Sequence, residues 1–143
     1  MIGASVSTAV STRFRLSGGE PHFQDAEAKN LSSIDIWLKA QKDSVVAEAL
    51  QHYSNQHNWF NLYKVYETIE KDTNRREGKR ETPRGSLDKW TSGRKWDFKE
   101  SANKHRHSSL GYHPKVGITI TYMSLQEADE FVSDLLFLWL QSK

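Results

Sequence analysis

The hydrophobic and polar positions of this 143-residue chain follow two different periods. From Val6 to Leu16, apolar residues and Thr share one parity with Ser, Ala and Arg between them, and residues 116–122 alternate in a similar way. A period of two is typical of a half-buried β-strand. We therefore expect an N-terminal strand extension within residues 1–25 to pair with a second strand over residues 116–122.

Two short helices are predicted after this extension. Ser33 is placed to cap the first and Asp43 to cap the second, because Ser and Asp side chains accept hydrogen bonds from the free N–H groups of a first turn. Each helix has apolar residues at helical spacing that predict a core-facing stripe. These residues are Ile34, Trp37 and Leu38 in the first helix and Val46, Ala49, Leu50 and Tyr53 in the second.

The strongest helical pattern in the centre of the chain runs from Asn58 to about Lys71. Its aromatic and aliphatic residues recur three, four and seven positions apart, which predicts one face against a core and one face in water. The next segment, residues 74–87, is polar and basic and contains Gly78 and Pro83. Because Gly and Pro interrupt regular structure, we expect a basic loop there.

Two further helices complete the predicted fold. One lies within residues 87–105 and is interrupted or started near Gly93. The start of the last helix is predicted by a capping box, in which Glu127 follows Ser124 by three residues. The predicted fold class is mainly α, a helical bundle of about four principal helices with a small two-stranded β element. The length favours one domain over residues 1–143.

Composition excludes several classes of function. The chain has no cysteine, so disulfides, thiolate nucleophiles and Cys-ligated zinc are excluded. It lacks the glycine-rich phosphate loop, the Gly-x-Ser-x-Gly elbow and the His-Glu-x-x-His motif, so the hydrolases built on them have no support. No apolar run has the length of a membrane span or the form of a secretory signal, and we expect a cytoplasmic protein without a membrane partner.

Positive charge is concentrated in less than a quarter of the chain. Residues 74–106 contain eleven Lys or Arg against five acids, a net charge of +6, within an overall charge of +2. Basic residues interleaved with Trp90, Trp96 and Phe98 are typical of a surface that follows a phosphate backbone and stacks on bases. The alternative is a solvated charged loop and a helix whose aromatics face the core. The predicted nucleic-acid contacts are Arg75, Arg76, Lys79, Arg80, Arg94, Lys95 and Lys104.

The candidate chemistry lies between residues 103 and 113. There, three of the six histidines, His105, His107 and His113, surround Arg106. Imidazole titrates near neutral pH and guanidinium binds phosphate oxygens bidentately, so the cluster suits proton transfer beside a phosphate. Two other interpretations stay open: a three-histidine metal site, and two histidines that only end a helix where cations are favoured.

The spacing of Arg106 and His113, with six residues between them, resembles the R-x4-6-H motif of the HEPN superfamily, small helical-bundle proteins that include many RNase toxins and defence proteins. A polar residue often follows the arginine in that family, and His107 fits. The order of parts over residues 43–143 is also similar, from Leu-Tyr-Lys-Val-Tyr-Glu to the terminal helix opening Ser-Leu-Gln-Glu-Ala.

The resemblance implies metal-independent cleavage of RNA without a cofactor. His113 would act as the general base or acid, Arg106 would stabilise charge on the phosphate oxygens, and His107 would orient the phosphate or transfer the second proton. It also implies a homodimer and an antitoxin or defence-complex partner. The alternatives are a non-catalytic module that binds nucleic acid or protein, and a structural subunit that assembles through an exposed apolar face of the terminal helix, residues 135–140.

Overall fold

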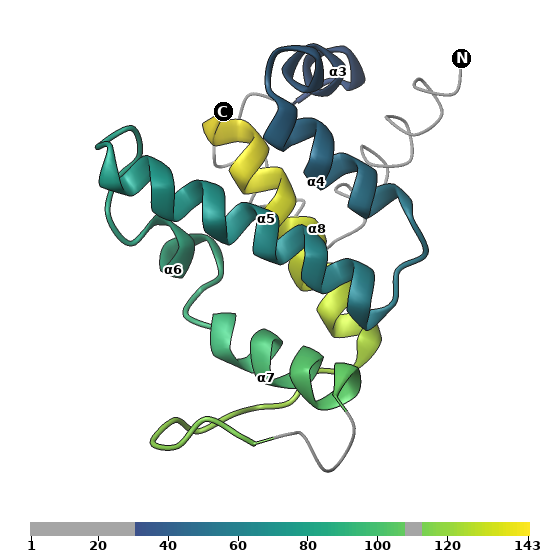
Figure 1. The fold of residues 1–143 in the computed structure, drawn as a ribbon, viewed down its shortest axis with the longest axis vertical. Helices are drawn as coiled ribbons and strands as arrows, with labels where there is room; N and C mark the ends of the chain where they lie inside the picture. The colour runs from purple at the N-terminus through teal and green to yellow at the C-terminus, as the bar shows by residue number, and fades with distance from the viewer. Residues whose placement is uncertain (1–30, 108–112) are drawn as a thin grey trace.

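The computed structural model describes residues 31–107 and 113–143, which form six helices, with α5 at the centre (Figure 1). α5 contacts α4 and α8 as well as the shorter α6 and α7, whereas α3 packs against α4. None of the helices in this described part combines the length and the apolar character that crossing a membrane requires. The helix bounds are α3 Ser33–Lys42, α4 Ser44–Ser54, α5 Trp59–Gly78, α6 Ser86–Trp90, α7 Lys95–Arg106 and α8 Leu125–Ser142.

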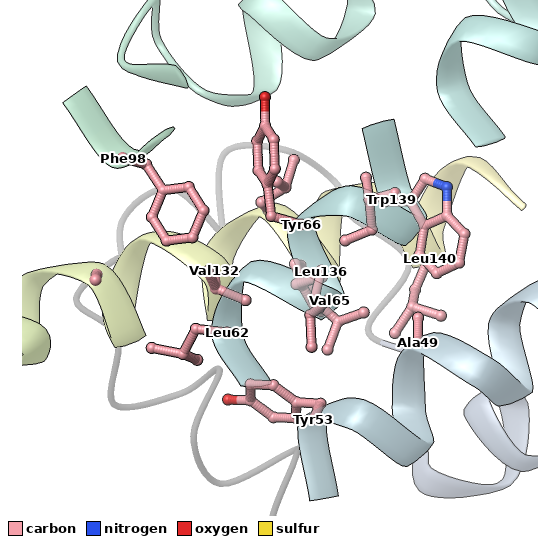
Figure 2. Packing of buried hydrophobic residues seen from close by; sticks show 14 of the residues in the cluster. Ala49, Tyr53, Leu62, Val65, Tyr66, Phe98, Val132, Leu136, Trp139 and Leu140 are labelled. Carbon is pink, nitrogen blue, oxygen red and sulfur yellow. The ribbon is translucent and has the colours of Figure 1, made fainter. Parts of the chain in front are cut away.

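One hydrophobic core joins these helices. Figure 2 shows Phe98 of α7 and Tyr66 of α5 beside the α8 side chains, with Tyr53 of α4 at the opposite side. Trp139 is the largest fully buried side chain of this core. The mainly helical fold class predicted from the sequence is therefore confirmed.

Polar caps begin the helices close to where the sequence predicted them. Asp43 accepts from the backbone N–H of Val45 at 2.9 Å and starts α4, as expected. Ser124 Oγ accepts from the backbone N–H of Glu127 at 3.1 Å and starts α8. The cap of α3 is Ser32, one residue before the predicted Ser33, and it forms a capping box with Asp35.

The buried face of α3 is not the one predicted. Ile36 is buried, whereas Ile34, Trp37 and Leu38 are all exposed. The reason is that the main packing partner of α3 is α4, so a narrow stripe around Ile36 meets the core and the wider apolar face stays exposed.

The predicted loop over residues 74–87 is wrong at both ends, because α5 continues to Gly78 and α6 begins at Ser86. α5 ends in a Schellman motif: the N–H of Arg80 donates to the carbonyl of Glu77, and the N–H of Glu81 donates to the carbonyl of Arg76. Arg80 holds the left-handed position that glycine usually takes, with φ of 59°. Glycine at position 78 is simply the last helical residue.

The chain turns between α6 and α7 around Ser92 and Gly93, which both have positive φ, so the predicted interruption is confirmed. The alternative in which α8 exposes an apolar assembly face is not supported. Leu136, Phe137 and Leu140 are all buried, because α8 contacts both α5 and α6.

The predicted strand over residues 116–122 is also wrong, since the described residues contain no strand. The segment instead binds α7 through side chains: the N–H of Thr121 donates to Asp97 Oδ1 at 3.0 Å, and the N–H of Met123 donates to Ser101 Oγ at 2.8 Å. Val116 is 94% exposed, so the alternating pattern has no second layer to bury it. Its predicted partner within residues 1–25 lies outside the described residues.

Candidate functional site

The end of α7 and the start of α5 meet at one surface cavity. Figure 1 shows the last turn of α7 beside the first turn of α5, where Asn58 caps the helix by accepting from the N–H of Asn61 at 2.8 Å. Three consecutive residues of the sequence cluster reach this place because α7 ends at Arg106 and His107 is its C-cap. The cavity has a volume of 460 Å³ and is lined by Asn58, Trp59, Phe60, His105, Arg106 and His107.

Arg106 is held by a ring rather than by an acid. The central carbon of its guanidinium lies 3.8 Å from the centroid of the Tyr63 ring, and Nη1 donates to Asn103 Oδ1 at 3.4 Å. Its Nε is buried and has no hydrogen-bond partner in the described part of the chain. An arginine stacked on an aromatic face keeps its full charge and is pre-oriented for an anion.

The acids around Arg106 are engaged elsewhere. The charge of Arg106 acts on Glu67, but the Glu67 carboxylate accepts a hydrogen bond from Lys71 at 3.1 Å. That hydrogen bond is the largest cause of the lowered pKa of Glu67, and Arg106 is a smaller one. Within residues 31–107 and 113–143, no carboxylate lies within ion-pair distance of Arg106. Among the described residues, the guanidinium charge is therefore not neutralised by a direct acidic partner.

His105 has a defined position in the wall of the cavity. Its ring stacks on the Trp59 indole with centroids 4.7 Å apart and planes 4° from parallel. His107 is exposed beside it, at the negative pole of α7, where a cation is favoured. This placement agrees with the interpretation that the two histidines end a helix. Both histidines also line the cavity.

His113 is not brought into the cavity. It lies in an exposed segment, it is not among the cavity-lining residues, and no hydrogen bond between His113 and Arg106 occurs in the described structure. The predicted pairing of Arg106 with His113 therefore stays a prediction. The three-histidine metal site has no support either, since the described residues contain no group of three His, Asp or Glu side chains suited to a metal ion.

Comparison with known proteins gives no further guide. No family model, curated protein or solved structure matches this chain significantly. The resemblance to the HEPN superfamily depends on the motif and on the order of parts alone. Function must be argued from the residues of the site.

The seven predicted nucleic-acid contacts occupy very different surroundings. Arg76 is only 7% exposed, and its guanidinium donates to Ser142 O at 2.7 Å and Ser142 Oγ at 3.0 Å. This geometry gives Arg76 a structural role, and we do not propose it as a nucleic-acid contact. Arg75, Arg94 and Lys95 are paired with Asp72, Asp97 and Asp88 respectively.

Lys79, Arg80 and Lys104 are the predicted contacts that have no acid beside them in the described residues. Lys79 and Arg80 are exposed at the end of α5. Lys104 is exposed on α7, and its Nζ lies 4.6 Å from the centroid of the Tyr122 ring. Lys79 and Arg80 follow the C-terminal end of α5, whereas Lys104 is in the last turn of a different helix, α7. The basic segment therefore does not form the single continuous tract that its sequence suggested.

The aromatics of the basic segment serve the fold. Phe98 is fully buried against Tyr66 and Phe131, as the alternative interpretation expected. Trp96 contacts two cations, with Lys99 Nζ at 4.8 Å and Lys115 Nζ at 3.4 Å from its ring centroids. The aromatics that face the cavity are instead Trp59 and Phe60, which the sequence pattern assigned to a core helix. The sequence feature that could have identified this surface is the position of Phe60 outside the apolar stripe of α5.

Proposed function

We propose that this protein binds RNA and cleaves it without a metal ion, as a ribonuclease of HEPN type. The observation that carries the proposal is the position of Arg106: a guanidinium fixed on Tyr63, without an acidic partner in the described residues, in a cavity that it shares with two histidines. Anionic phosphate is the group that such a site attracts most strongly.

The proposed reaction is an attack by a ribose 2′-hydroxyl on the adjacent phosphorus. A histidine removes the 2′-hydroxyl proton, the bond from phosphorus to the 5′-oxygen breaks, and a second group returns a proton to that oxygen. The products are a 2′,3′-cyclic phosphate and a 5′-hydroxyl end. Arg106 binds the non-bridging oxygens, where negative charge grows in the transition state. His107 and His113 are the candidates for the two proton transfers.

A non-catalytic RNA-binding module is the second candidate. It is favoured by the exposed position of His113 outside the cavity, which leaves His107 as the only candidate proton-transfer residue that lines it. The homodimer, the cytoplasmic location and the antitoxin or defence-complex partner belong to the HEPN proposal and have no separate support in the fold.

The test is RNA cleavage in the presence of EDTA. Wild-type protein is expected to release fragments with 2′,3′-cyclic phosphate ends, and Arg106→Ala is expected to reduce the rate by about 10²–10³-fold, the usual effect of removing one charge-stabilising donor. His107→Ala and His113→Ala identify the residues that transfer protons. Fragment ends are read by labelling after opening of the cyclic phosphate.

Arg84→Ala is the matched control, because Arg84 is exposed, is not one of the predicted contacts, does not line the cavity, and the change removes the same charge. It should lower binding only slightly. Salt-sensitive binding without cleavage would support the non-catalytic module, and activity that EDTA removes would contradict the metal-independent reaction.

A further inference from the structure

The first turn of α5, the central helix of the core, exposes an aromatic ring to solvent. Phe60 is 56% exposed, although Leu62 and Val65 on the same helix are buried. Lys64 Nζ lies over one face of the Phe60 ring, 5.5 Å from its centroid, and places a positive charge there. A single exposed Phe would carry no inference, but this one lines the cavity that contains Arg106.

Two further flat rings line the cavity. Trp59 and His105 stack nearly parallel, and this contact helps to hold the indole in one orientation. A volume of 460 Å³ lies within the range of small-ligand sites. The space is therefore suited to a planar group.

The cavity offers a ligand a hydrogen-bond donor and a cation. Asn58 Oδ1 already accepts from the N–H of Asn61, which fixes the amide orientation, and its Nδ2 has no hydrogen bond to any described residue. Arg106 supplies the positive charge, and His107 lines the same space. Flat apolar faces beside a free amide donor and a guanidinium match one kind of ligand, a planar ring with acceptor atoms on its edge that is attached to a phosphate.

We infer that this cavity is a nucleobase subsite, in which a base stacks on Phe60 while the adjacent phosphate binds Arg106. The inference extends the proposed function and depends on it for the assignment of the phosphate to Arg106. Phe60 is a binding residue here and takes no part in proton transfer.

The test uses binding to single-stranded oligonucleotides that cannot be cleaved. Two probes of equal length carry 2′-O-methyl sugars, one with bases and one abasic at successive positions. Phe60→Ala is expected to weaken binding of the base-bearing probe by about tenfold, the usual effect of removing one stacking ring, and to leave binding of the abasic probe unchanged. Phe60→Tyr keeps the ring and should bind like wild type.

Trp37→Ala is the control, because Trp37 is an exposed aromatic residue on α3 and does not line the cavity. It should bind both probes like wild type. Equal weakening of both probes by Phe60→Ala, an unchanged affinity for the base-bearing probe, or no binding of either probe by wild type would overturn the subsite.

This result is independent of catalysis. If wild type binds the bases through Phe60 but does not cleave RNA in EDTA, the catalytic proposal fails and the subsite stands. If it cleaves RNA and Phe60→Ala has no base-dependent effect, only the subsite fails.

Discussion

The two ends of α5 each have an arginine beside them, and the structure uses these arginines in opposite ways. At the C-terminal end, Arg76 is buried and donates to the last turn of α8. At the N-terminal end, Arg106 of α7 stacks on Tyr63 and faces a cavity. Both arginines come from the same basic stretch of sequence, so charge density alone does not separate a structural cation from a binding one. The groups around each guanidinium do.

Asp72 makes the difference at the C-terminal end. Its buried carboxylate contacts Arg75 at 2.8 Å, Lys143 Nζ at 3.0 Å and the Trp139 indole N–H at 2.9 Å, with Arg76 at 3.7 Å. Every charge in this cluster has a partner of opposite sign. The cavity near Arg106 has no such carboxylate among its lining residues, which leaves its charge for a ligand.

Removing Asp72 should have the largest effect on stability. Asp72→Ala leaves Arg76 buried without its carboxylate and leaves Lys143 with Asp43 as its remaining acid, and we expect the free energy of unfolding to fall by about 3–5 kcal/mol. Alanine is a good helix former, so α5 itself should persist. Urea denaturation followed by circular dichroism and Trp fluorescence measures the change.

Glu67→Ala is the matched control for that variant, because Glu67 is a carboxylate on the same helix paired with Lys71 at the surface. It should cost about 0.5 kcal/mol or less. A similar loss in both variants would mean that the buried cluster contributes no more than a surface ion pair.

Of the two arginines, Arg76 should matter more for stability and Arg106 more for RNA binding. Arg76→Ala removes hydrogen bonds between α5 and α8 and should lower the free energy of unfolding by about 1–3 kcal/mol. Arg106→Ala removes a partly exposed contact with Tyr63 and should cost about 1 kcal/mol or less. For affinity to a 2′-O-methyl RNA probe, Arg106→Ala should have the larger effect. Equal effects of the two variants on affinity would break the comparison between the two ends of α5.

Sequence reasoning identified the starts of helices better than their ends. Asp43, Asn58 and Ser124 act through local hydrogen bonds to their own first turns, which a short stretch of sequence specifies. The last turn of α5 was missed because Arg76 is stabilised by Ser142, which lies 66 residues later. The Schellman motif was missed because Arg80 occupies a position where glycine is expected.

The candidate site was predictable in part. The sequence placed His105, Arg106 and His107 together, and all three line one cavity. Trp59 and Phe60 could not be joined to them, because the contact between the start of α5 and the end of α7 is tertiary. The same limitation applies to residues 116–122, whose alternation was read as a strand although Asp97 and Ser101 of α7 bind its backbone.

The smallest expected effect concerns the contribution of Asp72 to acid sensitivity. Burial acts to raise the pKa of Asp72, but hydrogen bonds from Arg75, Lys143 and Trp139 outweigh it, and the pKa is lowered. Asp43 also contacts Lys143; burial acts to raise its pKa, and the hydrogen bond from Lys143 helps to lower it.

A lowered carboxyl pKa stabilises the folded state above the pKa of the unfolded chain, about 3.9, and this contribution is lost as pH falls through the folded value. Asp72→Asn removes the titrating carboxyl. Its free energy of unfolding should therefore fall less steeply than that of wild type between pH 5 and pH 2.5, as urea denaturation at a series of pH values would show. Parallel pH profiles for the two proteins would mean that Asp72 does not stabilise the folded state through its charge, and the contrast with Arg106 would then depend on burial alone.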